Sequence, residues 1–175
     1  MRELAALAAE LRTTDRTLRR AVAEGLIHAE RRSPRTIELS AAERAYLRRN
    51  WIRLAALRRV LRTEPNVEAA ILFGSVARGT DGPESDLDLL VALRDDSSLA
   101  AAQLAVRLDE RLGATVQVTR LSQALGSPVL LAEVLRDGRP LVERGDAWRK
   151  VKRRERATVR AADAVLTEAW AELIG

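Results

Sequence analysis

Apolar residues recur every three or four positions over much of the chain, and this spacing predicts amphipathic helices. Thr14 and Ser40 stand directly before two of these segments and have the side chains of N-cap residues. Gly25 follows the second segment, as a C-terminal glycine does. The predicted helices cover residues 4–11, 15–23, 41–62, 99–112, 129–136 and 147–173.

Short apolar runs between the helices predict strands. Two of these runs, residues 26–30 and 36–39, flank a basic turn that contains Ser33 and Pro34, and they predict a hairpin. The other predicted strands are residues 71–73, 86–91, 114–119 and 141–142.

The last predicted helix, residues 147–173, has one apolar face. Its members fall within a sector of about 100° on a helix of 3.6 residues per turn. They are Trp148, Val151, Val159, Ala162, Leu166, Ala169, Trp170 and Leu173. This face predicts either docking of the helix on its own domain, or contact with a second copy of the chain or a partner protein.

The composition limits the class of protein. A chain of 175 residues forms one domain or two small ones, and its 3% of aromatic residues requires a mainly aliphatic core. The absence of cysteine and the single histidine exclude disulfides and zinc sites built from several such residues. Neither an apolar run of membrane-spanning length nor a signal segment is present, so we expect a cytoplasmic protein with no membrane partner.

Positive charge is concentrated at the start of the chain. Residues 1–62 contain 15 arginines and 7 acidic residues, a net charge of +8. Residues 63–145 carry −5 and residues 146–175 carry +2. A basic module of this kind is typical of nucleic-acid binding, although a GC-rich genome also enriches arginine.

The most informative motif lies in the middle of the chain. Gly74-Ser75 follows an apolar strand, and Asp86 and Asp88 stand two residues apart on the next one. Because side chains alternate along a strand, both carboxylates emerge on one face. Paired carboxylates suit Mg²⁺ that is bound together with nucleotide phosphates. The small turn lets backbone amides approach those phosphates, and Arg78 supplies a counter-charge.

This motif resembles that of the minimal nucleotidyltransferases in the DNA polymerase beta superfamily. Their motif is Gly-Ser, a short helix often ending in Ala-Arg-Gly, and an Asp-x-Asp strand, found here at residues 74–79 and 86–88. The resemblance covers about residues 67–144. It implies an α/β (α+β) fold in which helices flank a mixed sheet, and a nucleoside triphosphate, with ATP favoured, as the bound cofactor. The implied site has Asp86 and Asp88 as catalytic residues and Mg²⁺ ligands, and Gly74, Ser75 and Arg78 as nucleotide contacts.

One position departs from the family pattern. The family's third carboxylate lies on a later strand, and the matching residue here is Gln117. An amide oxygen can coordinate a cation, but it is neutral and does not take a hydroxyl proton at ordinary pH. Asp109 and Glu110 precede this strand on a helix, and we expect them to face solvent. The substitution favours retained nucleotide and metal binding over retained turnover.

Residues 3–39 resemble a winged helix-turn-helix domain, with two short helices followed by a hairpin. In such a domain the second helix enters the major groove of double-stranded DNA. The expected DNA contacts are therefore Arg16, Thr17, Arg19 and Arg20 on the second helix, and Arg31, Arg32 and Arg35 on the wing. A small helical bundle with a solvated basic face would produce the same pattern.

These predictions divide the chain into four parts. They are a winged helix-turn-helix module at 1–40, a connecting helix at 41–64, a nucleotidyltransferase-like domain at 65–145 and a C-terminal amphipathic helix at 146–175.

Two functions fit this organisation. In the first, the protein transfers a nucleoside monophosphate to an acceptor; by the resemblance, the acceptor is a HEPN-type toxin and the protein an autoregulating antitoxin. In the second, it is a transcriptional regulator whose degenerate nucleotidyltransferase-like domain serves as a nucleotide sensor or a platform for a homodimer.

Overall fold

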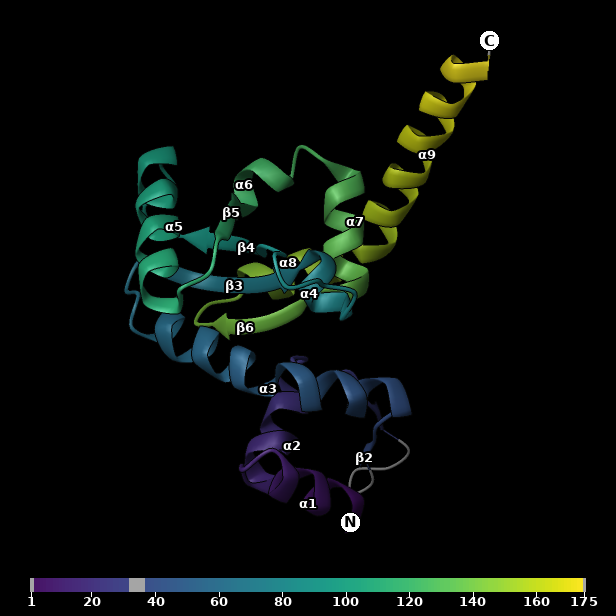
Figure 1. Cartoon of the computed structure of the whole chain (residues 1–175). Coiled ribbons are helices and arrows are strands. Elements are labelled where there is room, and N and C mark those ends of the chain that lie inside the picture. Colours follow the sequence, from purple (N-terminus) through teal and green to yellow (C-terminus); the bar gives the residue numbers. More distant parts are fainter. Residues whose placement is uncertain (1, 32–36, 175) are drawn as a thin grey trace. The chain divides into compact units, whose positions relative to one another are not determined.

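The computed structural model describes residues 2–31 and 37–174, and the chain forms two compact units, Met1–Arg59 and Val60–Gly175 (Figure 1). Helix α3 (Ala41–Arg62) starts in the first unit, and its last residues belong to the second. None of the described helices has both the length and the apolar composition needed to cross a membrane.

The first unit begins with two short helices, α1 (Arg2–Glu10) and α2 (Asp15–Ala23). Thr14 caps α2, since its hydroxyl oxygen accepts the backbone N–H of Thr17 at 3.1 Å, and this confirms the predicted cap. Leu18 and Ala21 are fully buried. The inward face is therefore centred one residue earlier than the sequence predicts, and Val22 is only half-buried.

A hairpin and α3 complete the first unit. Strands β1 (Glu30–Arg31) and β2 (Ile37–Glu38) pair antiparallel, as predicted, while the turn residues 32–36 lie outside the described residues. Ser40 caps α3 by accepting the backbone N–H of Glu43 at 3.0 Å. The Glu43 carboxylate in turn accepts the backbone N–H of His28 at 3.0 Å. These two bonds fix the entry of the chain into α3.

The second unit contains a four-stranded mixed sheet in the order β5-β4-β3-β6 (Figure 1). Strand β3 is antiparallel to β4 and β6, and β4 is parallel to β5. In chain order its elements are β3 (Val67–Phe73), α4 (Gly74–Arg78), β4 (Leu87–Leu93), α5 (Ser98–Leu112), β5 (Val116–Arg120), α6 (Leu121–Ala124), α7 (Pro128–Asp137), β6 (Arg139–Glu143), α8 (Ala147–Arg153) and α9 (Glu155–Ile174). A mixed sheet with flanking helices confirms the predicted fold class.

Helices α6, α7 and α8 bury one face of this sheet. Ile71 of β3 and Leu90 of β4 pack in one cluster with Val134 of α7 and Trp148 of α8. All four are at most 2% exposed, and burial of such a side chain stabilises the fold by about 1.5–3 kcal/mol. This core holds rigid the strands that carry the candidate site.

The C-terminal segment differs from the single helix predicted over 147–173. Arg154 has non-helical dihedral angles, φ −100° and ψ 8°, and separates α8 from α9. Trp148 and Ala162 are buried, whereas Leu166 and Trp170 are 45% and 64% exposed. Docking on the chain's own domain is therefore correct only for the first part of this segment, and α9 extends away from the sheet (Figure 1).

Candidate active site

The turn between β3 and α4 brings the backbone of Gly74 against Asp88. Gly74 has φ +72°, in the left-handed region that favours glycine. A β-carbon at this position would lie 3.0 Å from Asp88 Cγ and closer still to Asp88 Oδ2. Only glycine satisfies both the dihedral angle and the space, so the Gly-Ser turn and the carboxylate form one site.

Asp86 and Asp88 lie at the start of β4. Leu87 and Leu89 are buried while both aspartates are half-buried, which confirms the predicted alternation of faces. Asp88 pairs in register with Phe73 on β3 and with Gln117 on β5. The sheet thus fixes the carboxylates between two neighbouring strands.

Gln117 faces the two carboxylates, as its assignment to the third-carboxylate position requires. Its side-chain amide donates a hydrogen bond to Asp86 Oδ2 at 2.6 Å. Within residues 2–31 and 37–174, no three His, Cys, Asp or Glu side chains are arranged to hold a metal ion together. The site therefore consists of two carboxylates and one neutral amide.

Asp109 does not face solvent as the sequence analysis predicts. This half-buried side chain accepts the backbone N–H of Val116 at 2.7 Å and so holds the start of β5. Glu110 is exposed, as predicted. Asp109 also lines, with Asp86 and Thr115, a cavity of about 530 Å³ beside the site.

Arg78 forms an ion pair with Glu133 of α7. The sequence analysis missed Glu133, because no motif marks it and only the fold brings α7 beside α4. Both side chains are a little more than one-third exposed, so solvent and ligands reach the pair. The residue predicted to contact phosphates thus has a carboxylate partner in this structure.

The negative groups of the site raise the pKa of Asp88. Partial burial is the main cause, and the charges of Asp86 and Glu133 add to it, while Arg78 acts in the opposite direction. A cation beside Asp88 would relieve this repulsion. Hard carboxylate oxygens are the ligands that Mg²⁺ prefers, and one or two of them suffice when nucleotide phosphates complete the shell. The residues present therefore fit a Mg²⁺–nucleotide.

The residues predicted to contact DNA lie on a different part of the chain. Arg16 is exposed and has no side-chain partner among the described residues. Arg19 pairs with Asp15, and Arg20 pairs with Glu24 at 2.7 Å. Thr17 is exposed, with its hydroxyl 2.8 Å from that of Thr14. The Arg31 side chain and all of Arg32 and Arg35 lie outside what the structure describes.

A Gly-Ser turn packed against paired carboxylates on a mixed sheet is the arrangement expected of a nucleotidyltransferase domain. Residues 56–147 match the family described as Polymerase beta, Nucleotidyltransferase. The match spans more than half of the 175 residues, so the chain belongs to this nucleotidyltransferase family. Among curated proteins, no sequence match is found.

Solved structures share the fold. A toxin–antitoxin structure with AMP-PNP contains a chain of 23% identity and TM-score 0.57, matched over 70% of this chain and 98% of that one. The toxin–antitoxin MntA–HepT gives 20% identity and TM-score 0.54, over 71% and 99%. The tri-AMPylated Shewanella oneidensis HEPN toxin in complex with MNT antitoxin gives 20% identity and TM-score 0.55, over 72% and 99%. At these identities the likeness concerns the fold.

Proposed function

We propose that this protein is a minimal nucleotidyltransferase that transfers a nucleoside monophosphate to a hydroxyl group of a partner protein. The observation that carries the proposal is the contact of Gly74 with Asp88, which joins the turn and the carboxylates within the region matched to the family. In the reaction the acceptor oxygen bonds to the α-phosphorus, the bond to the bridging oxygen breaks, and pyrophosphate leaves. The hydroxyl proton passes to solvent or to a base on the partner.

The chain's own residues have distinct roles in this proposal. Asp86 and Asp88 hold Mg²⁺, which when bound neutralises charge on the triphosphate. The backbone at Gly74 and Ser75 contacts the phosphates, and Arg78 exchanges Glu133 for a phosphate oxygen. Gln117 orients Asp86 through its hydrogen bond and takes no proton.

A HEPN-type toxin is the proposed acceptor, and the protein its antitoxin. The support is that the three similar solved structures are toxin–antitoxin complexes, one of them with AMP-PNP and one with a tri-AMPylated toxin. AMP-PNP is an analogue of ATP, so we propose ATP as the donor.

Transfer of a labelled nucleotide tests this function. The protein, Mg²⁺, ATP labelled in its α-phosphate and the product of the neighbouring gene are combined, and the label should appear on the partner. Asp88→Ala should abolish the transfer, whereas Glu110→Ala, which removes an exposed carboxylate of α5, should leave it unchanged. Absence of label with every nucleoside triphosphate contradicts the proposal.

The neutral amide at position 117 favours a second function, that of a nucleotide sensor without turnover. Gln117 lies where the family has a carboxylate and hydrogen-bonds to Asp86. In this case Mg²⁺–ATP binds but no label moves, and Gln117→Asp gains measurable transfer. Active wild-type protein contradicts this alternative.

We further propose that residues 1–40 form a winged helix-turn-helix module that binds double-stranded DNA, joined by a connecting helix at 41–64 to the catalytic domain at 65–145. The support is the +8 charge of residues 1–62 and the exposure of Arg16 and Arg20 on α2. An operator of its own genes would then allow autoregulation.

Mobility-shift titration with the protein's own promoter tests DNA binding. The affinity should fall steeply with salt, because each phosphate contact releases counterions. Arg16→Ala with Arg20→Ala should reduce discrimination between promoter and unrelated DNA. Arg94→Ala with Arg136→Ala, which removes equal charge from the second unit, is the control. No shift at low salt contradicts the proposal.

A further inference from the structure

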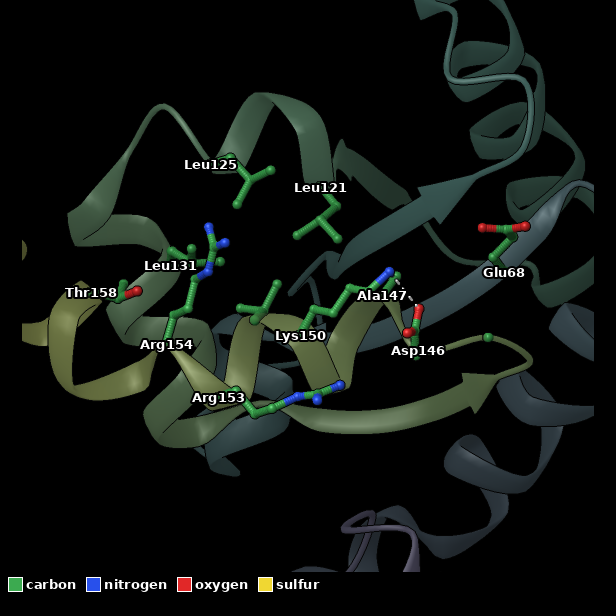
Figure 2. A pocket seen from close by; sticks show the side chains of 12 residues that line it. Glu68, Leu121, Leu125, Leu131, Asp146, Ala147, Lys150, Arg153, Arg154 and Thr158 are labelled. Atoms are coloured by element: carbon green, nitrogen blue, oxygen red, sulfur yellow. Dashed lines mark ion pairs between the residues drawn. The ribbon is translucent and has the colours of Figure 1, made fainter.

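A cleft of about 750 Å³ lies in the second unit, away from the candidate active site (Figure 2). Leu121, Leu125, Leu131 and Val151 form its apolar lining, and Arg154 lines it beside Leu131. These residues come from α6, α7, α8 and the segments that join them. A cleft of this composition fits an apolar side chain of a ligand that also carries negative charge.

The edge of the cleft is strongly basic. Residues 147–156 contain six basic residues and one acidic residue. Lys150 is paired with Asp146 at 3.0 Å, but the Arg154 side chain has no partner among the described residues. Arg153 also lines the cleft. An acidic partner would therefore meet positive charge that the chain itself leaves uncompensated.

The distal part of α9 has the complementary character. Residues 161–175 contain Asp163, Glu168 and Glu172 and neither lysine nor arginine. Leu166 is 45% and Trp170 is 64% exposed, a large apolar surface to leave in water. Burial of one such side chain contributes about 1.5–3 kcal/mol. This part of the helix, here called the α9 arm (residues 163–172), is acidic and apolar, as the cleft requires.

The α9 arm does not reach the cleft of its own chain. Thr158, near the start of α9, already lines the cleft. A helix rises 1.5 Å per residue, so Trp170 lies about 18 Å farther along the same continuous helix. The cleft and the arm are therefore available only to other molecules.

We propose that the α9 arm of one copy docks in the cleft of a second copy, and that the second copy returns the same contact. Leu166 and Trp170 of the arm meet the apolar lining, and Glu168 and Glu172 meet Arg153 and Arg154. Because each copy offers both surfaces, the exchange closes as a two-fold dimer and buries both arms at once. This self-association is independent of the nucleotidyltransferase activity proposed above.

A charge exchange between the two surfaces tests the dimer. The arm variant is Glu168→Lys with Glu172→Lys, and the cleft variant is Arg153→Glu with Arg154→Glu. Wild-type protein should have about twice the monomer mass of 19.3 kDa in light scattering. Each variant should be monomeric, since its arm and cleft have like charge. A 1:1 mixture should restore a dimer, since every arm then meets a cleft of opposite charge.

Controls separate this interface from general charge effects and from misfolding. Glu3→Lys with Glu110→Lys changes the charge equally at exposed positions elsewhere and should remain dimeric. Trp170→Ala keeps all charges and should weaken dimerisation at least tenfold, with an unchanged circular dichroism spectrum. A monomeric wild-type protein at tens of micromolar overturns the proposal, and so does a mixture of the two variants that stays monomeric. Binding of the α9 arm only to a different protein gives the first of these results.

Discussion

The side-chain amide of Gln117 donates a hydrogen bond of 2.6 Å to Asp86 Oδ2 and so joins β5 to the residue that precedes β4. The amide holds one carboxylate in place without adding charge to the site. Asp86 and Asp88 then provide both of the negative ligands that the site offers from these strands. The charge of the metal site is lower by one than in the family pattern with three carboxylates.

Gln117→Asp should tighten Mg²⁺ binding. The new carboxylate adds a negative hard-oxygen ligand at a position in register with Asp88, and we expect an increase of about tenfold, or 1.4 kcal/mol. Titration calorimetry of Mg²⁺ with and without ATP measures it. Gln117→Asn keeps the neutral amide and should show no gain; an equal gain for both variants would remove the electrostatic explanation.

Gly74→Ala should destabilise the fold and abolish binding of Mg²⁺–ATP. The positive φ alone costs about 1–3 kcal/mol for a residue with a side chain, and the added carbon also displaces Asp88. Urea denaturation measures the first effect and calorimetry the second. Gly82→Ala is the matched control, because an added carbon there meets nothing within 4 Å. Wild-type affinity in the Gly74 variant would show that this turn does not contact the nucleotide.

Glu133→Gln should increase the affinity for Mg²⁺–ATP. It releases Arg78 and removes one negative charge near Asp88, and the bound complex itself remains negatively charged. We expect a gain of up to about fivefold, since a partly exposed ion pair is worth roughly 0.2–1 kcal/mol. Asp137→Asn breaks an ion pair at the end of the same helix and serves as the control. A decrease in affinity would indicate that Glu133 itself assists metal binding.

Binding of Mg²⁺–ATP should weaken at weakly acidic pH. Burial and the neighbouring carboxylates raise the pKa of Asp88, so protons compete with the metal at a higher pH than for an ordinary aspartate of pKa about 3.9. Calorimetry across this pH range measures the loss. A pH dependence confined to values below 4 would contradict the raised pKa.

Asp88→Asn should stabilise the ligand-free protein at neutral pH. A raised pKa in the folded state means that the folded chain binds more protons than the unfolded chain, so the free energy of unfolding falls as pH rises through that interval. The variant removes this loss, and Tm should rise by about 2–4 °C for each kcal/mol regained. Thermal unfolding at neutral and acidic pH tests it, with the exposed Glu110→Gln as control. An equal shift in both variants would contradict the assignment to Asp88.

Local chemistry made much of this molecule predictable. Thr14 and Ser40 cap their helices by short-range hydrogen bonds, which depend on neighbouring residues only. Strand alternation also placed Asp86 and Asp88 on one face, and the resemblance identified the position of Gln117. Glu133 and Asp109 escaped prediction because their partners, Arg78 and Val116, are brought to them by packing of helices against the sheet. The exposed end of α9 escaped it too, because helical periodicity shows that a face is apolar but not what covers it.

The one-residue break at Arg154 sets the rotational phase of everything that follows it. An α-helix turns by about 100° per residue, so insertion or deletion of a single residue here would rotate Leu166 and Trp170 by that angle relative to the sheet. The acidic side chains of α9 would rotate with them, while the cleft-lining residues Leu121 and Leu131 would keep their positions. Relatives with the same catalytic motif can therefore differ in binding specificity through a change of length rather than of composition at this position.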